Sequence, residues 1–187
     1  MRLATVVFII LVLVISAAGQ TNSAQTGSRS LYFLSDSDEH WCAYGDETEW
    51  KSDVQRLRAL TVAMIQYTGD RVSLMHFTDE DEAGDWIVYD IYSMDKQGKI
   101  ESLTRTINII PEDRSELETW RIQGGKPSRQ NSISRTLGTL KPVEPTPIFL
   151  PGEPIITSLE TLPFWAWARD KRQDVWAKGK MCFAVQQ

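Results

Sequence analysis

A histidine and a carboxylate in the middle of the chain form the pair best suited to general acid–base chemistry. His76 lies in "RVSLMHFT" (71–78) and Asp90 in "WIVYDIYSM" (86–94), two segments with the composition of β-strands. If Thr78 faces Trp86, His76 lies diagonal to Asp90 on one face, where it could act as the base of a hydrolase. No GxSxG motif accompanies the pair. Because a lone inward histidine is more often structural, catalysis is kept here as an alternative.

The hairpin that carries Asp90 also predicts a face of mixed chemistry. The residues Asp95–Gly98 read as a tight turn followed by a bulge, so Asp95 closes against Lys99. Counting back from that turn places Asp90 opposite Thr104. Apolar surface with a few convergent polar groups is typical of ligand pockets, although half-covered sheet faces have the same composition. The predicted binding surface consists of Trp86, Asp90, Tyr92, Thr104, Thr106 and Asn108.

Two acidic segments resemble calcium-binding loops without matching them. In "DEDEAGDWIVYD" (79–90), Ala83 stands where an oxygen ligand is needed, and in "DSDEHWCAYGDE" (36–47), Trp41 stands where glycine is needed. The two histidines, His40 and His76, are far apart and offer no zinc-binding spacing. The sequence therefore predicts no metal ion and no cofactor.

The N-terminus and the cysteines indicate export. An apolar run from Leu3 to Ile15 is followed by the small residues of a signal-peptidase site, which predicts a signal peptide over 1–19. After its cleavage no segment is apolar enough to keep the chain in a membrane. In an oxidising compartment the two cysteines, Cys42 and Cys182, are most simply a disulfide. We therefore expect a secreted protein, periplasmic or extracellular.

Composition restricts the partners. The chain has a formal net charge of −5 with scattered Lys and Arg, which argues against nucleic acid or anionic lipid surfaces. Seven tryptophans invite a glycan-binding interpretation, but large aromatic residues also dominate the cores of small domains. The expected partner is an unidentified protein, peptide or glycan.

The pattern of strands and turns predicts a single α+β domain over 31–187, after a disordered polar segment over 20–30. Its centre is a four-stranded antiparallel meander over 57–110, with turns at Gly69-Asp70, 79–85 and 95–98. A looser hairpin turns at Gly124-Gly125, and weaker strands lie at 32–34 and 40–44.

The C-terminal third predicts three further elements, and the acidic segment 47–57 predicts a short helix. A proline-rich arm covers 142–154, where helix and central strand are both excluded. A helix over 162–178 is capped by Thr161 and ended by Gly179, and "MCFAV" is a short strand beside 40–44.

These patterns favour a small exported β-rich domain that acts as a non-catalytic binding or interaction module. The alternatives are a small hydrolase that uses His76 and Asp90, and a protein that binds glycan or cell wall through exposed Trp and Tyr side chains.

Overall fold

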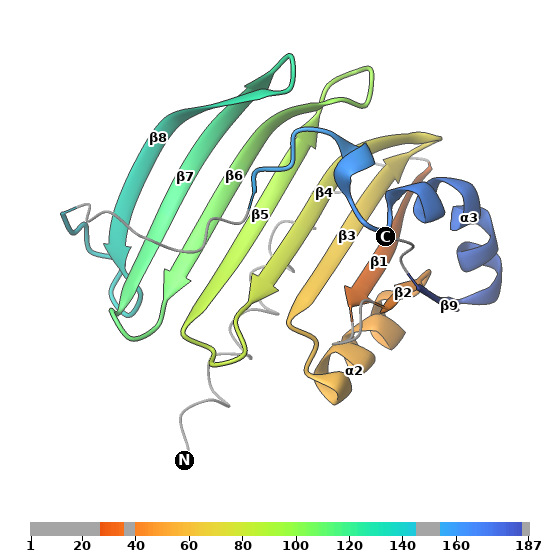
Figure 1. The fold of residues 1–187 in the computed structure, drawn as a ribbon, viewed down its shortest axis with the longest axis horizontal. Coiled ribbons are helices and arrows are strands. Elements are labelled where there is room, and N and C mark those ends of the chain that lie inside the picture. Colours follow the sequence, from red (N-terminus) through yellow and green to blue (C-terminus); the bar gives the residue numbers. More distant parts are fainter. Residues whose placement is uncertain (1–26, 36–39, 145–153, 185–187) are drawn as a thin grey trace.

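The protein folds around one antiparallel sheet (Figure 1). The structure is a computed structural model that describes residues 27–35, 40–144 and 154–184. Within those residues the sheet has nine strands in the order β8-β7-β6-β5-β4-β3-β1-β2-β9, which confirms the predicted α+β class. The strands are β1 (Ser28–Ser35), β2 (His40–Tyr44), β3 (Thr61–Thr68), β4 (Arg71–Glu80), β5 (Trp86–Met94), β6 (Ile100–Ile109), β7 (Arg114–Gln123), β8 (Lys126–Thr136) and β9 (Lys180–Ala184).

Six consecutive strands, β3 to β8, form a meander that includes the four predicted strands. The three turns at one edge of this meander place glycine in the left-handed backbone region, at Gly69 (φ 63°), Gly98 (φ 79°) and the pair Gly124-Gly125 (φ 58° and 73°). In the second of these turns the Asp95 carboxylate accepts hydrogen bonds from the amides of Gln97 and Lys99. Alternate turns of a meander lie at the same edge of a sheet, so these three turns are neighbours.

The first two strands extend the sheet beyond the meander. β1 pairs with both β2 and β3, so the connection from β2 to β3 passes through helix α2 (Glu47–Leu57) and crosses β1. β1 begins at Ser28, so the last three residues of the segment predicted to be disordered belong to a strand. The predicted signal peptide and residues 20–26 lie outside the described residues.

β9 is the last strand of the sheet and pairs with β2. In this pairing Cys42 of β2 faces Cys182 of β9. The two residues form the predicted disulfide, across a sequence separation of 140 residues. Such a bond is consistent with an oxidising, extracytoplasmic location.

The two faces of the sheet have different covers. We call inner the face covered by helix α3 (Trp165–Lys178) and by residues 154–164 (Figure 1), and outer the opposite face. α2 lies on the outer face over β1, where Trp50 contacts the Tyr32 ring at 5.2 Å. The main core lies on the inner face and includes Phe33, Ile65, Met75, Tyr92, Leu103, Phe164, Ala168 and Val175.

The C-terminal helix begins three residues later than predicted. Residues Leu159–Thr161 form a 3-10 turn, and Phe164 rather than Thr161 is the N-cap of α3. The predicted stop is confirmed, because Gly179 is the C-cap and donates its amide to the Val175 carbonyl. The helix starts late because Phe164 is buried against Phe33 and Trp41, so packing decides where the chain turns.

Gly45 lets α3 approach the end of β2. Its amide donates to the Gly179 carbonyl at 2.7 Å, and a Cβ on it would lie 3.0 Å from the Val175 carbonyl oxygen. We expect Gly45→Ala to lower the free energy of unfolding by about 1–3 kcal/mol, the usual cost of overpacking. Urea denaturation measures the change. Gly138→Ala is the control, because the nearest atom to its added Cβ is an ordinary contact at 3.7 Å; equal losses in both variants would contradict this role.

Candidate functional site

The pairing of β5 with β6 differs by one residue from the prediction. Met94 pairs with Ile100, as the turn requires, but Ser93 pairs with Ser102, so Glu101 is an extra residue in a bulge. From there on the register is shifted, and Asp90 faces Arg105 instead of Thr104. A shift of one residue moves a whole row of side chains to the other face.

The predicted binding surface is therefore divided between the two faces, and that prediction of a single surface is wrong. Trp86, Asp90 and Tyr92 lie on the inner face, in register with Ile109, Arg105 and Leu103. The other three predicted residues lie on the outer face, in register with a different row of β5 residues. That outer row pairs Thr104, Thr106 and Asn108 with Ile91, Tyr89 and Ile87.

The predicted catalytic pair does not form either. Phe77 is the β4 residue that pairs with Asp90, whereas His76 pairs with Ile91 on the outer face. Since side chains alternate along a strand, His76 and Asp90 point to opposite sides of the sheet. Burial lowers the pKa of His76, which keeps the imidazole neutral near pH 7.

Asp90 is instead the centre of a buried ionic network on the inner face. Arg105 donates from Nε and Nη2 to the two carboxylate oxygens of Asp90, at 2.8 and 2.7 Å. The Tyr92 hydroxyl donates to Asp90 at 2.9 Å and accepts from the Ile156 amide at 3.2 Å. Burial, together with the Asp90 charge, raises the pKa of Tyr92. Burial alone would lower the pKa of Arg105, but the bond and charge of Asp90 outweigh it. The carboxylate is thus fully engaged.

The network continues across the neighbouring strands. Glu118 lies opposite Arg105 and accepts from the Arg129 guanidinium and the Trp120 indole, both at 3.0 Å. Two residues before Glu118 in β7, Glu116 forms an ion pair with Arg114. Glu116 also accepts a hydrogen bond from the Ser134 hydroxyl at 2.7 Å. These ion pairs and hydrogen bonds compensate the buried charges of Asp90, Glu116 and Glu118, so we assign the network a structural role.

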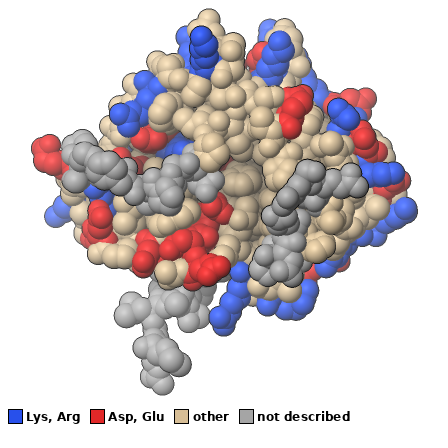
Figure 2. Space-filling model, viewed as in Figure 1, with Lys and Arg blue, Asp and Glu red and all other residues tan. Residues whose placement is uncertain are grey.

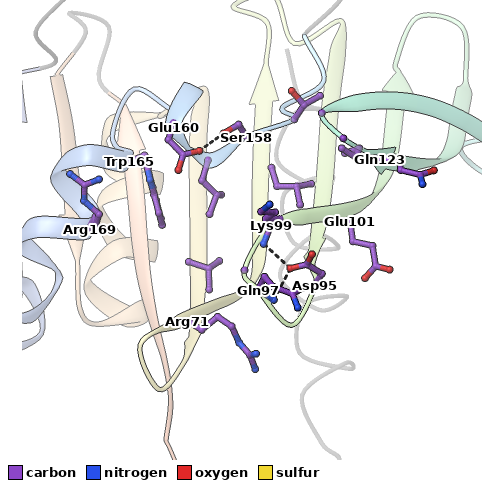
Figure 3. A pocket seen from close by; sticks show the side chains of 18 of the residues that line it. Arg71, Asp95, Gln97, Lys99, Glu101, Gln123, Ser158, Glu160, Trp165 and Arg169 are labelled. Atoms are coloured by element: carbon purple, nitrogen blue, oxygen red, sulfur yellow. Dashed lines mark hydrogen bonds between the residues drawn. The ribbon is translucent and has the colours of Figure 1, made fainter.

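A large cavity lies at the edge of the sheet that carries the three glycine turns. This turn-edge cleft, of about 1220 Å³, is bounded by the turns between β3 and β4, β5 and β6, and β7 and β8. On the inner face it is bounded by residues Thr157–Glu160 and the first turns of α3, as Figure 3 shows. Its described lining includes a set of largely buried apolar side chains. They are Val72, Ile100, Ile122, Leu159 and Trp165.

Three basic side chains of the cleft have no carboxylate partner among the described residues: Arg71, Lys99 and Arg121. All three are exposed: Arg71 begins β4, Lys99 directly precedes β6 and Arg121 lies near the end of β7. Arg71 donates to the Lys96 carbonyl at 2.5 Å, which fixes its guanidinium beside the β5–β6 turn. In Figure 2 the basic side chains of this edge stand at the upper rim, away from the acidic side chains gathered at lower left.

The carboxylates of the cleft are mostly engaged. Asp70 accepts from Arg172 at 2.6 Å, and Asp95 is occupied by its own turn. Glu160 accepts from the Ser158 hydroxyl, and this bond lowers the pKa of Glu160. Glu101 alone has neither an ion pair nor a side-chain hydrogen bond to described residues. The cleft thus combines available cations with apolar surface, and an anionic ligand matches it.

The described residues contain no group of three or more His, Cys, Asp or Glu placed to hold a metal ion. In the calcium-like loop, Asp79 accepts from the Thr61 hydroxyl and Asp81 accepts from the Trp86 amide, as in an ordinary acidic turn. The other calcium-like segment, 36–47, lies partly outside the described residues.

The tryptophan side chains pack within the fold rather than forming an exposed aromatic surface. All seven are buried or half-buried. Trp167 stacks on Phe183 at 4.1 Å and Trp176 donates its indole to the Ser30 carbonyl. Trp165 is the tryptophan that lines the turn-edge cleft.

The proline-rich arm falls largely outside the described residues, which stop at Glu144 and resume at Pro154. Pro142 forms a bridge with Arg135, and Ile155 and Ile156 pack on the core after the gap. The residues that follow Ile156, numbers 157–160, lie over the sheet and form part of the cleft wall.

Comparison of the chain with models of known protein families, with curated proteins and with solved structures finds no match. Among the described residues no helix is long and apolar enough to cross a membrane.

Proposed function

We propose that the protein is an extracytoplasmic, non-catalytic binding module whose turn-edge cleft takes a ligand with an acidic group and an apolar portion. The observation that carries the proposal is that Arg71, Lys99 and Arg121, which have no carboxylate partner among the described residues, line the same cleft as a set of apolar side chains. Pockets that bury small ligands have this build, with mostly apolar walls and a few polar groups that fix orientation.

The energies favour an anion over a neutral ligand. A charge-assisted hydrogen bond contributes about 1.5–3 kcal/mol, and burial of apolar surface adds roughly 25 cal/mol per Å². The net charge of −5 belongs to the whole chain and is a poor guide to this cleft, where most carboxylates are engaged and three cations have no carboxylate partner among the described residues. The lining can bind and orient a ligand without transferring a proton.

Dodecanoate, used below its micellar concentration, is the probe. We expect the double variant Lys99→Gln/Arg121→Gln to bind dodecanoate about ten- to hundred-fold more weakly than the wild type, since two charge-assisted contacts are lost. Isothermal titration calorimetry measures the affinity.

Two controls separate the cleft from general electrostatics. Lys171→Gln/Lys178→Gln removes the same charge from exposed positions of α3 that do not line the cleft, and it should leave the affinity unchanged within a factor of two. Dodecyltrimethylammonium, which has the same chain and the opposite charge, should not bind in the cleft. Equal affinities of both double variants, or equal binding of the two detergents, would refute the proposal.

A further inference from the structure

A second, smaller cavity lies under the segment that follows the proline-rich arm. This pocket, of about 300 Å³, separates the inner face of β4 and β5 from residues Pro154–Thr157 and Thr161–Pro163. Its volume is at the lower end for small-molecule sites. We call it the strap pocket, because those residues lie across the sheet above it.

The walls of the strap pocket are mostly apolar. Phe77 and Val88 rise from the sheet, and Leu162 closes the pocket from the opposite side. Val88 and Leu162 are 4% and 5% exposed, so a ligand there would lie in a water-poor environment. Ile155 and Ile156 complete the apolar lining.

Two carboxylates are the ionisable groups among the described lining residues, and their surroundings differ. Asp79 of β4 pairs with Val88 of β5, and Phe77 of β4 pairs with Asp90 of β5. The two aspartates therefore lie on the same face of neighbouring strands, diagonal to each other and offset by two residues along the strands. Arg105 compensates Asp90 through two hydrogen bonds. Asp79 accepts from the Thr61 hydroxyl at 2.5 Å and has no cationic partner within the described part of the chain. The pocket therefore holds one carboxylate that no cation of the described residues compensates.

A charge beside an apolar cavity is stabilised by an opposite charge that enters with its own apolar body. We propose that the strap pocket binds a small primary amine, with the ammonium on Asp79 and the hydrocarbon body between Phe77, Val88 and Leu162. Arg105 is already committed to Asp90, so the ligand ammonium takes the place of the missing partner of Asp79. The site is opposite in sign to the turn-edge cleft and does not depend on it.

The probes are 2-phenylethylamine, its neutral isostere 2-phenylethanol, and the acid 3-phenylpropionate, each titrated by calorimetry against the full chain. We expect the amine to bind and Asp79→Asn to weaken it at least ten-fold, with no change in the weak binding of the alcohol. Asp85→Asn is the matched control, since Asp85 is exposed in the same acidic loop and does not line the pocket; it should change the affinity less than two-fold.

A variant that fills the pocket guards against misfolding of Asp79→Asn. Leu162→Phe should abolish amine binding while thermal unfolding stays cooperative. Lys99→Gln/Arg121→Gln should leave amine binding intact, which separates this site from the cleft. The inference is overturned if the wild type does not bind the amine at millimolar concentration, if Asp79→Asn binds it as well as Asp85→Asn does, or if the acid binds as tightly as the amine.

Discussion

Asp90→Ala is expected to lower the free energy of unfolding by about 3–5 kcal/mol, the usual cost of breaking a buried ion pair. The variant removes the bidentate carboxylate partner from Arg105, whose side chain is 9% exposed. It also removes the carboxylate that accepts a hydrogen bond from the Tyr92 hydroxyl. That hydroxyl in turn accepts a hydrogen bond from the Ile156 amide. Urea denaturation followed by far-UV circular dichroism measures the loss.

Two further variants distinguish a buried charge from a lost contact. Asp90→Leu/Arg105→Met removes both charges, so it should be more stable than Asp90→Ala, because no unpaired charge remains buried. Asp170→Ala breaks the exposed pair with Arg169 and should cost no more than about 1 kcal/mol. If Asp90→Ala loses no more than Asp170→Ala, Asp90 does not hold the inner face together.

Cys42→Ser/Cys182→Ser is expected to lower the free energy of unfolding by about 2–5 kcal/mol. The disulfide closes a sequence separation of 140 residues, so its loss releases a long loop in the unfolded chain. Equilibrium urea denaturation at neutral pH gives the difference.

Reduction supplies the control for the cysteine variant. Dithiothreitol should destabilise the wild type by a similar amount and leave the double variant unchanged. A loss below about 1 kcal/mol in both comparisons would mean that the ladder between β2 and β9 already confines the chain end.

The elements of the fold were predictable where a local cause decides them. Asp46 caps α2 through the Glu49 amide, and Arg58 in the left-handed conformation ends it at the predicted residue. Glycine at the turns of Gly69, Gly98 and Gly124-Gly125 and a disulfide between the two cysteines likewise have causes that a sequence displays. The four central strands of the meander followed from these turns; β7 and β8 extend it beyond the predicted 57–110.

The register was not predictable, because it depends on packing across the whole sheet. One extra residue, Glu101, lets Asp90 meet Arg105 and Tyr92 meet Leu103 on the buried side. The turn at Asp95–Gly98 specifies only the first pairs after it. One unpaired residue was enough to divide the predicted surface between two faces.

The candidate site was predictable in part. Arg71 and Lys99 directly follow their turns and Arg121 lies just before its turn, and alternate turns of consecutive antiparallel strands share an edge. Leu159 and Trp165 reach the cleft only because the C-terminal segment returns over the inner face. No local pattern encodes that return.

The most direct test of the binding role is a titration of ¹⁵N-labelled protein with dodecanoate, followed by amide chemical shifts. We expect saturable shifts centred on Lys99, Arg121, Gly124 and the Trp165 indole, with little change at Ile91 and Thr104 on the outer face. Shifts confined to the outer face, or none that saturate, would contradict the claim that the turn-edge cleft is where this protein meets its ligand.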